Sequence, residues 1–192
     1  ESAAIIATGM RGNVFVVDKS KKRLRELHKQ FGDKIIPTES SKTDLKKLIS
    51  ECDLLIGGVL IPGAEAPKLV SKEMIKTMKR GSVVVDVAID QGGCVETSKP
   101  TTHANPTYLV DDVVHYCVAN MPGGVPRTST MALNKATLPL LLKLADQGYK
   151  KTLIENKNFL AGLNIYKGKI TFKGVSDAFN LEFTKATEVL RN

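Results

Sequence analysis

Tryptophan is absent from these 192 residues, and aromatic side chains make up only 5% of them. Proteins that read single-stranded nucleic acids stack bases on aromatic side chains, and no segment here combines aromatic and basic residues in that way. The Lys and Arg residues behind the net charge of +8 are spread over helix-like segments such as residues 19–29 and 42–47. We therefore interpret the charge as a solvated basic surface and expect no nucleic-acid partner.

Long apolar runs and paired cysteines are also lacking. No run approaches the roughly 20 apolar residues that span a bilayer, and the first residues do not have the basic-then-apolar pattern of a signal peptide. The three cysteines, Cys52, Cys94 and Cys117, form no C-x-x-C pair and leave one cysteine unmatched in any disulfide scheme. We expect no membrane partner and a reducing, cytoplasmic location.

What the sequence does contain is a steady alternation of strand-like and helix-like segments with short connections. With 42% hydrophobic residues the chain can bury a core. Alternation of this kind predicts an α/β fold, a doubly wound Rossmann-type parallel sheet. The predicted strands are residues 13–18, 34–37, 53–57, 82–87 and 113–119, with helices at 2–8, 20–31 and 44–52 and another that opens at Ser71.

The strand at residues 82–87 is the most informative, because its apolar run leads into Asp90, Gln91, Gly92 and Gly93. In open α/β sheets, ligands bind outside the carboxyl ends of the strands. The pattern therefore indicates a ligand site around Asp90. The alternative interpretation is a solvated turn in which Asp and Gly supply the bend.

Asp18 ends an earlier strand and has a second possible meaning. In dinucleotide-binding units, an acidic residue about 20 residues after a G-x-G-x-x-G turn binds the ribose hydroxyls. Counting back from Asp18 places that turn before Glu1, and the chain begins without Met in what looks like a helix interior. We expect a fragment whose sheet is truncated at its first strand. Asp18 as a plain turn or helix-cap residue is the alternative.

The segment from Asn120 to Arg127 marks the predicted domain boundary, because two prolines and two glycines make it a rigid, exposed connection. It divides the chain into residues 1–127 and 128–192. After it we expect a long apolar helix from Ser129 to Gly148, a hairpin over residues 163–172 and a helix from Ser176 onward.

Several segments together resemble the alanine dehydrogenases. They are Gly58–Val70, Val85–Cys94, Pro100–His103 and His115–Gly123 with its continuation through Ser129. The related transhydrogenase alpha subunits share the fold and parts of these motifs. The combination of Asp90-Gln-Gly-Gly with His115-Tyr-Cys-Val-Ala-Asn is more similar to alanine dehydrogenase.

The resemblance implies reversible, NAD-dependent oxidative deamination of L-alanine to pyruvate and ammonium by hydride transfer. It also implies a homohexamer. Residues 1–127 would be an NAD-binding domain, incomplete at its N-terminus, and residues 128–192 the C-terminal part of a substrate domain. The family's glycine turn, and the Arg, Lys and His that act on the substrate, have no counterpart here. We therefore expect the 192 residues alone to be inactive.

Residue by residue, the resemblance implies one catalytic group and a set of cofactor contacts. Asp90 matches the active-site aspartate, which would assist proton transfer and hold the substrate amine. The cofactor-binding positions implied are Asp18, Arg23, Ser40, Val59, Leu60, Val87, Ala88, Ile89, Asp90, Lys99, Val118, Ala119, Asn120 and Met121.

The histidines are not expected to replace the missing catalytic groups. His115 lies in an apolar strand and is interpreted as a hydrogen-bonded core residue, and His28 as a surface residue. A metal site of His103, Cys94 and Cys117 is disfavoured by their irregular spacing, so no metal is expected.

Two other classes of function stay open. One is a module that binds NAD or NADH without catalysis, or that serves a separate catalytic chain as a transhydrogenase alpha subunit does. The other, with less support, is nucleic-acid binding through the basic surface, which the salt dependence of duplex binding would test.

Overall fold

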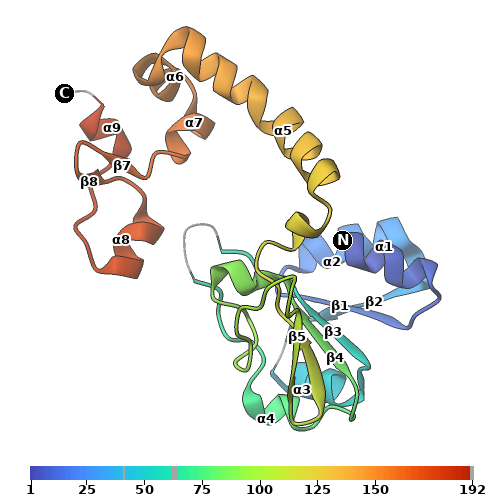
Figure 1. The fold of residues 1–192 in the computed structure, drawn as a ribbon. Coiled ribbons are helices and arrows are strands. Elements are labelled where there is room, and N and C mark those ends of the chain that lie inside the picture. The colour runs from blue at the N-terminus through green and yellow to red at the C-terminus, as the bar shows by residue number, and fades with distance from the viewer. Residues whose placement is uncertain (41, 62–64, 191–192) are drawn as a thin grey trace.

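The structure is a computed structural model that describes residues 1–40, 42–61 and 65–190, with the backbone alone for residues 42–44. The first elements form a small unit around two parallel strands, β1 (Val14–Asp18) and β2 (Ile35–Glu39). Three helical segments accompany them: α1 (Ser2–Gly9), α2 (Lys21–Phe31) and the 3-10 turn η1 (Gly32–Lys34). Figure 1 shows this unit in blue.

Helix α2 forms as the sequence predicts. The Ser20 side chain accepts the N–H of Arg23 at 3.2 Å, which satisfies one of the free donors of the first turn. Leu24 and Leu27 are the buried residues of the helix, and α2 packs on both strands. Glycine at position 32, with φ 57°, ends the helix.

The second sheet has four strands in the order β3 (Leu54–Gly57), β4 (Val83–Asp86), β6 (Val113–Tyr116) and β5 (Thr107–Val110). Helix α3 (Lys42–Glu51), the single turn α4 (Lys72–Ile75) and the 3-10 turn η2 (Val87–Gln91) belong to this part of the chain. Ser71 caps α4 as predicted, because its side chain accepts the N–H of Met74 at 3.3 Å.

The α/β prediction is confirmed, and the predicted parallel pairing is found between β1 and β2, between β3 and β4, and between β4 and β6. The strands of the described residues do not form one sheet, however, but three sheets of two, four and two strands, and β5 runs antiparallel to β6. Strand β5 was not predicted. Its signal is the pair Asp111 and Asp112, both with positive φ (51° and 61°), which joins β5 to β6 as a two-residue hairpin turn.

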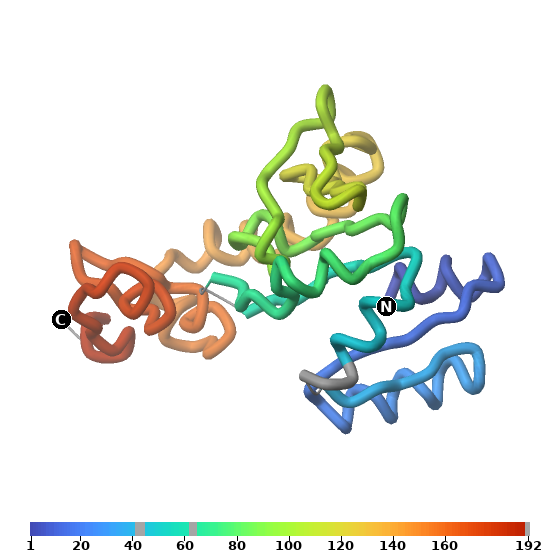
Figure 2. Tube along the Cα trace, turned by 90° about the horizontal axis from the view of Figure 1, so that it is seen from below, coloured from blue at the N-terminus to red at the C-terminus, as the bar shows by residue number. Residues whose placement is uncertain are grey.

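Beyond η3 (Met121–Gly124), helix α5 (Pro126–Gln147) leads to a second group of elements. It begins at Pro126 rather than at Ser129, because proline fits the first turn of a helix. Figures 1 and 2 show the C-terminal group, in orange and red, lying away from the β1–β2 unit. This group contains α6 (Tyr149–Glu155), α7 (Lys157–Ala161), β7 (Ile165–Tyr166), β8 (Lys169–Ile170), α8 (Lys173–Phe179) and α9 (Ala186–Val189).

The predicted hairpin in this group is confirmed, since β7 and β8 pair antiparallel. The single helix predicted from Ser176 is wrong. Helix α8 begins at Lys173 and ends where Asn180 takes a left-handed conformation with φ 51°, and α9 is a separate short helix. Asparagine accepts this conformation more readily than most residues, which explains the early end.

The main hydrophobic core lies around β4 and contains side chains from segments that precede and follow β4 in the sequence. Its buried members are Ile49, Ala66, Val70, Ile75, Met78, Val84, Ala88, Cys94, Val95 and Val113. A smaller cluster of Leu153, Val189 and Leu190 holds the C-terminal group together.

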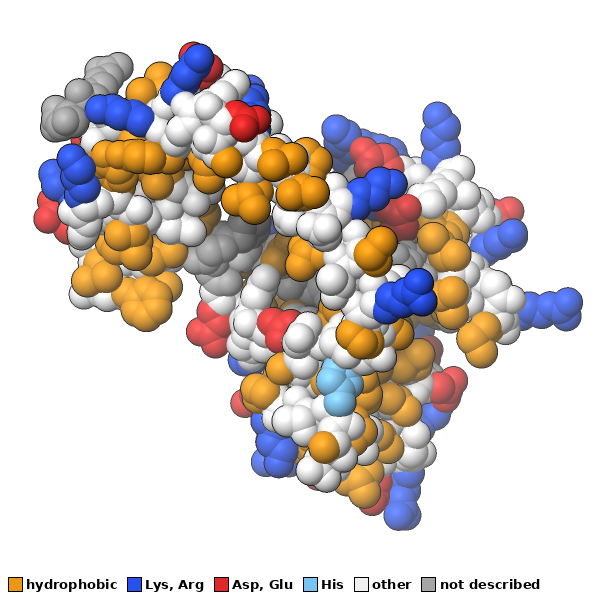
Figure 3. Space-filling model, turned by 45° about the horizontal axis from the view of Figure 1, so that its top comes forward, with side chains coloured by type: hydrophobic (Ala, Val, Ile, Leu, Met, Phe, Trp, Pro, Cys, Tyr) orange, Lys and Arg blue, Asp and Glu red, His pale blue; other side chains and the backbone are white. Residues whose placement is uncertain are grey.

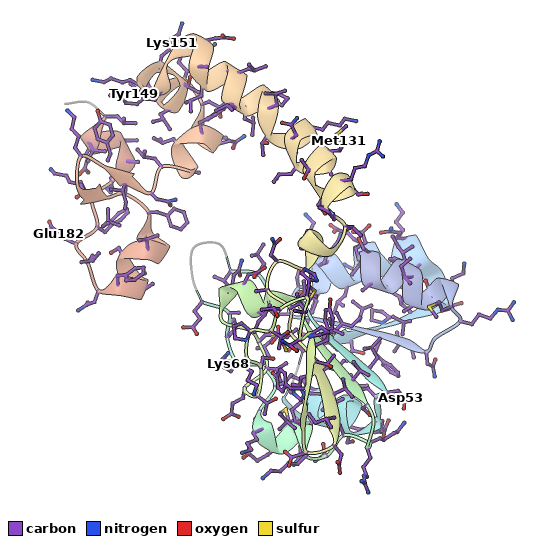
Figure 4. All side chains as sticks on the ribbon, viewed as in Figure 1. Asp53, Lys68, Met131, Tyr149, Lys151 and Glu182 are labelled. Carbon is purple, nitrogen blue, oxygen red and sulfur yellow. The ribbon has the colours of Figure 1, made fainter. Side chains whose placement is uncertain are left out.

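Much apolar surface is left uncovered. Helix α5 buries none of its residues, and Met131, labelled in Figure 4, is 68% exposed. Phe15 on β1 and Leu54 on β3 are exposed as well, and both strands lie at the edges of their sheets. Figure 3 shows the hydrophobic side chains gathered in patches on one face. No helix among the described residues is long and apolar enough to cross a membrane.

The packing around Gly57 yields a first test. Gly57 pairs with Asp86 across β3 and β4, and a Cβ at this position would collide with the Cys94 sulfur, whereas a Cβ on Gly58 would meet nothing within 4 Å. We expect Gly57→Ala to lower the free energy of unfolding by about 1–3 kcal/mol through overpacking. Urea denaturation of the chain measures it, with Gly58→Ala as the matched neighbour that stays within about 0.5 kcal/mol.

A double-mutant cycle identifies the cause. Removing the sulfur with Cys94→Ala opens the space that the new methyl needs, so Gly57→Ala should cost less in that background. An equal cost in both backgrounds would contradict the collision.

Candidate functional site

The site is built around a buried carboxylate at the end of β4. Asp86 has no exposed surface and lies on the strand between β3 and β6. Its Oδ1 accepts the N–H of Ala88 at 3.1 Å, and its Oδ2 accepts those of Cys94 at 2.9 Å and Val95 at 3.1 Å. Three charge-assisted hydrogen bonds satisfy a buried carboxylate that would otherwise be costly. Asp86 thereby fixes both ends of the segment from Val87 to Val95.

The segment between these ends is a tight turn that needs its two glycines. Gly92 and Gly93 have φ of 87° and 75°, values that side-chain-bearing residues rarely adopt. Their N–H groups donate to the carbonyls of Ile89 at 3.1 Å and Ala88 at 2.9 Å. From outside, the ammonium of Lys68, labelled in Figure 4, donates to the carbonyls of both glycines. The turn is therefore held by hydrogen bonds within its own backbone and by the Lys68 side chain.

Asp90 lies on this turn, exposed, at the carboxyl end of β4. The N–H of Asn120, at the end of the segment that follows β6, donates to Asp90 Oδ1 at 3.1 Å. Asn120 has left-handed backbone angles, φ 55° and ψ 52°. The structure thus brings together Asp90 and Asn120, predicted as site residues from segments far apart in the sequence. They meet where ligands bind in open α/β sheets.

A second group of predicted residues meets at the ends of β1 and β2. The carbonyl of Asp18 accepts the N–H of Ser40 at 3.0 Å, and Asp18 Oδ1 accepts that of Ser20 at 2.7 Å. Asp18 therefore also acts as the turn residue of the alternative interpretation. Arg23 follows on α2, where ion pairs with Glu26 at 3.1 Å and Glu1 at 2.6 Å raise its pKa.

The apolar residues of the predicted site divide by burial. Ala88, Ile89 and Val118 have buried side chains, so only their backbone could face a ligand. Others are partly or largely exposed: Val59, Leu60, Val87, Ala119 and Met121.

Lys99 is exposed, and its ammonium lies 4.6 Å from the centre of the Tyr108 ring. The hydroxyl of Tyr108 accepts the N–H of Lys99 at 2.8 Å and donates to the carbonyl of Thr97 at 2.9 Å. The side chain and the backbone of Lys99 are thus both held against one residue of β5.

The histidines behave differently from one another. His115 is fully buried, with Nε2 2.8 Å from Thr97 Oγ1 and Nδ1 3.0 Å from the carbonyl of Val113, which confirms a core histidine. Burial lowers its pKa. His28 is exposed, as predicted. His103, which the sequence did not assign to the site, has Nε2 3.2 Å from the carbonyl of Asn120.

The cysteines have separate surroundings. Cys94 Sγ lies 3.5 Å from Asp86 Oδ1, and Cys117 Sγ lies 3.6 Å from both Tyr108 Oη and Ser98 Oγ. In the part of the chain that the structure describes, no three His, Cys, Asp or Glu side chains are grouped so that they could hold a metal ion.

Sequence reasoning missed Asp86 and Lys68. The signal for Asp86 was present, because a carboxylate inside an apolar strand must be buried and hydrogen-bonded. Lys68 had no comparable signal, since its partners are backbone carbonyls distant in sequence.

The residues present suit a dinucleotide. The carboxylate of Asp18, at the end of β1, provides acceptor groups of the kind that bind ribose hydroxyls, and the backbone of Ser40 is hydrogen-bonded to the Asp18 carbonyl. The exposed groups of Asp90 and Asn120 lie at the ends of β4 and β6. Two shallow hollows lie elsewhere, one beside α2 and one on α5, and neither is lined by a predicted site residue. The edge of the sheet is therefore the candidate site.

Fold and geometry together define an α/β protein with parallel strands and a candidate ligand site at their carboxyl ends. Residues 1–173 match the family model described as "Alanine dehydrogenase/PNT, C-terminal domain". The chain belongs to this family.

Relatives and solved structures agree with this assignment. An alanine dehydrogenase of Halomonas elongata is 53% identical over 190 residues, covering 99% of this chain and 51% of the relative. Alanine dehydrogenase 2 of Staphylococcus aureus is 50% identical over 191 residues, with 99% and 51% covered. The chain thus spans about half the length of these curated relatives.

Among solved structures, an L-alanine dehydrogenase matches with a TM-score of 0.80 and 45% identity, over 93% of this chain and 49% of that one. A transhydrogenase from Sinorhizobium meliloti matches with a TM-score of 0.62 and 29% identity, over 73% and 40%. The predicted resemblance to alanine dehydrogenases is confirmed.

The surroundings of Cys94 yield a second test. Burial, and secondly the charge of Asp86, raise the pKa of the Cys94 thiol to about 11. The thiol should therefore stay protonated and slow to alkylate at pH 8, and its rate should rise only as the pH approaches that value. Mass spectrometry of iodoacetamide-treated folded chain measures the rate at each pH. Asp86→Asn removes the neighbouring charge and should shift the pH profile of Cys94 downward; an unshifted profile would contradict the role of that charge.

Proposed function

We propose that this chain forms the nucleotide-binding half of an NAD-dependent enzyme that converts L-alanine and water reversibly to pyruvate and ammonium. The observation that carries the proposal is the exposed Asp90 carboxylate, held by the Asn120 N–H at 3.1 Å where β4 and β6 end. Family membership and relatives named alanine dehydrogenase support it. NAD, when bound, would accept the hydride from the substrate Cα.

The two groups of site residues have separate tasks in this proposal. Asp18 and Ser40 accept and donate hydrogen bonds at the ribose of the adenosine half, with Arg23 beside them. Val59 and Leu60 lie on the loop that follows β3, against the same half. The segments Val87–Asp90 and Val118–Met121, with Lys99, border the nicotinamide half.

Asp90 acts on the substrate. Its carboxylate holds the amine cation and moves protons while water adds to the imine and ammonia leaves. The hydrogen bond from Asn120 leaves one carboxylate oxygen available, and the exposed position gives the substrate access. The hydrogen bonds of Asp86 and Lys68 hold the turn in place, as a positioned acid or base requires.

The proposal extends to the arrangement of the whole protein. Residues 1–127 serve as NAD-binding domain and residues 128–192 as part of the substrate domain, with the boundary in the first turn of α5. The exposed apolar residues of α5 suit an interface in a cytoplasmic homohexamer.

A nucleotide-binding subunit is the second candidate, favoured by the match to the transhydrogenase from Sinorhizobium meliloti. Such a subunit binds the nucleotide but has no need of a carboxylate that acts on an amino acid. The consequence of losing Asp90 therefore separates the two functions.

The third test uses a chimera in which this chain is joined to the part of the Halomonas elongata relative that it does not match. We expect Asp90→Asn to lower alanine oxidation by roughly 10²- to 10⁴-fold, because the amide keeps the size but loses charge and basicity. NADH affinity, measured by fluorescence titration of the same preparation, should be retained.

Asp53→Asn is the matched control, since Asp53, labelled in Figure 4, is an exposed carboxylate whose ion pair with Lys79 lies at the start of β3. If Asp90 only shapes the turn, asparagine should replace it with little effect, because Asn suits the same turn conformations as Asp. A rate of alanine oxidation within a few-fold of the parent in Asp90→Asn would therefore reduce Asp90 to a turn residue and favour the nucleotide-binding subunit.

The fourth test addresses Asp18. In the chimera we expect a preference for NAD over NADP, because the carboxylate accepts ribose hydroxyls and repels a 2′-phosphate. The basic neighbours Lys19, Lys21 and Lys22 soften that repulsion, so the preference should be modest. Steady-state kinetics with both cofactors measure it. Asp18→Ala should improve the use of NADP, and no gain would remove Asp18 from the ribose site.

A further inference from the structure

One histidine beside the candidate catalytic carboxylate has no part in the proposed function. His103 lies in the segment between Lys99 and β5, and its Nε2 is 3.2 Å from the carbonyl oxygen of Asn120. The N–H of that same Asn120 donates to Asp90 Oδ1 at 3.1 Å. A single backbone residue thus connects the imidazole of His103 with the carboxylate of Asp90.

The direction of the first hydrogen bond follows from its chemistry. A carbonyl oxygen only accepts, so Nε2 of His103 carries the hydrogen. The same carbonyl also accepts the N–H of Gly123 at 2.8 Å, which closes the turn η3. The backbone carbonyl oxygen of Asn120 therefore accepts two hydrogen bonds, one from the His103 side chain and one from the Gly123 N–H of η3.

The His103 ring is fitted closely to that turn. A Cβ on Gly124 would lie 3.1 Å from Cε1 of the ring, and one on Gly123 would lie 3.5 Å from Nε2. Two glycines in succession let the ring approach the backbone, which a side chain at Gly124 would hinder.

The segment that carries His103 is anchored to the end of β6. Thr101 donates its N–H to the carbonyl of Cys117 at 2.9 Å, and its own carbonyl accepts the N–H of Ala119 at 3.1 Å. These bonds form a parallel bridge between Thr101 and Val118. His103 and Asn120 therefore belong to two segments that are paired with each other.

Asn120 needs such support because its backbone is in a sparsely populated conformation. Its φ of 55° and ψ of 52° place it in the left-handed region, which costs a non-glycine residue free energy even when it is asparagine. In this conformation its N–H points to Asp90 while its carbonyl meets His103.

We propose that His103 is a positioning residue for Asp90: its hydrogen bond to the Asn120 carbonyl holds the backbone of Asn120 in its left-handed conformation, and this conformation directs the Asn120 N–H to the carboxylate. The inference rests on the proposed function of Asp90. His103 itself touches neither the substrate nor the cofactor in this assignment.

The test measures three substitutions of His103 in the chimera. Glutamine can place a donor where Nε2 of histidine lies, asparagine reaches only as far as Nδ1, and alanine has no donor. We expect His103→Ala and His103→Asn to lower kcat about fivefold, the worth of one typical hydrogen bond, with NADH affinity unchanged. His103→Gln should restore kcat to within about twofold of the parent, and His28→Ala, on the exposed face of α2, should leave it unchanged.

A double-mutant cycle distinguishes an effect of His103 that acts through Asp90 from a loss of activity caused by a general disturbance of the structure. If His103 acts through Asp90, His103→Ala should change the residual rate by less than about twofold once Asp90→Asn is present. Equal losses in both backgrounds, or a glutamine variant as slow as the alanine variant, would overturn the proposal.

A measurement that does not depend on turnover keeps the inference separate from the proposed function. In NMR spectra of the 192-residue chain, the amide signal of Asn120 should shift with His103→Ala, which removes the hydrogen bond to its carbonyl. It should also shift with Asp90→Asn, which replaces the carboxylate that accepts its N–H with a neutral, weaker acceptor. An amide signal unmoved by either substitution would overturn the link. A chimera without turnover would instead count against the proposed function while the NMR result still decides the link.

Discussion

The buried carboxylate of Asp86 is the constraint on which the site depends. A charge without exposed surface must be fully hydrogen-bonded, and its three backbone donors come from Ala88, Cys94 and Val95. Those donors can converge only if the chain leaves β4, turns back within a few residues and passes the strand end again. Because the chain turns back in this way, Gly92 and Gly93 adopt positive φ, Lys68 can donate to their carbonyls, and Asp90 lies on the turn.

The same constraint reaches the neighbouring strand. Asp86 pairs with Gly57 on β3, and the Cys94 sulfur occupies the volume where a side chain at Gly57 would lie. A glycine at the end of β3 is therefore a requirement of packing under the turn. The glycine that follows it, Gly58, has open space around its Cα, so packing does not require a glycine there.

The sequence allowed the prediction of the strands and hence of a candidate site at their ends. Period and composition located β1, β3, β4 and β6, and the rule that ligands bind at carboxyl ends pointed to Asp90. What it could not supply was the pairing. Strand β5 escaped notice because its turn uses Asp111 and Asp112 in positive φ, where glycine and asparagine are the usual signals.

The separation of β1 and β2 from β3, β4 and β6 depends on contacts between distant segments, which local patterns do not give, although a sheet that lacks its first strand, as the sequence led us to expect, would divide at this point. The order β2-β1 on one side and β3-β4-β6 on the other is that of a doubly wound sheet around its first strand. The exposed side chains of Phe15 and Leu54 lie on β1 and β3, the two strands that would flank that position. Local patterns identified these strands correctly but did not give their pairing.

Two carboxylates four positions apart illustrate how surroundings assign roles. Each has room for about four hydrogen bonds when ionised. Asp86 spends three on the backbone and is closed off from solvent, so it can only shape the turn. Within the described residues, the one hydrogen bond found for the Asp90 side chain comes from Asn120, and the rest of its capacity faces outward. In the proposed function, a group that exchanges protons with a substrate must keep such capacity free, and it must also stay in place. Asp86 and Lys68 hold the turn, and the Asn120 N–H holds the carboxylate, so that Asp90 itself can remain exposed.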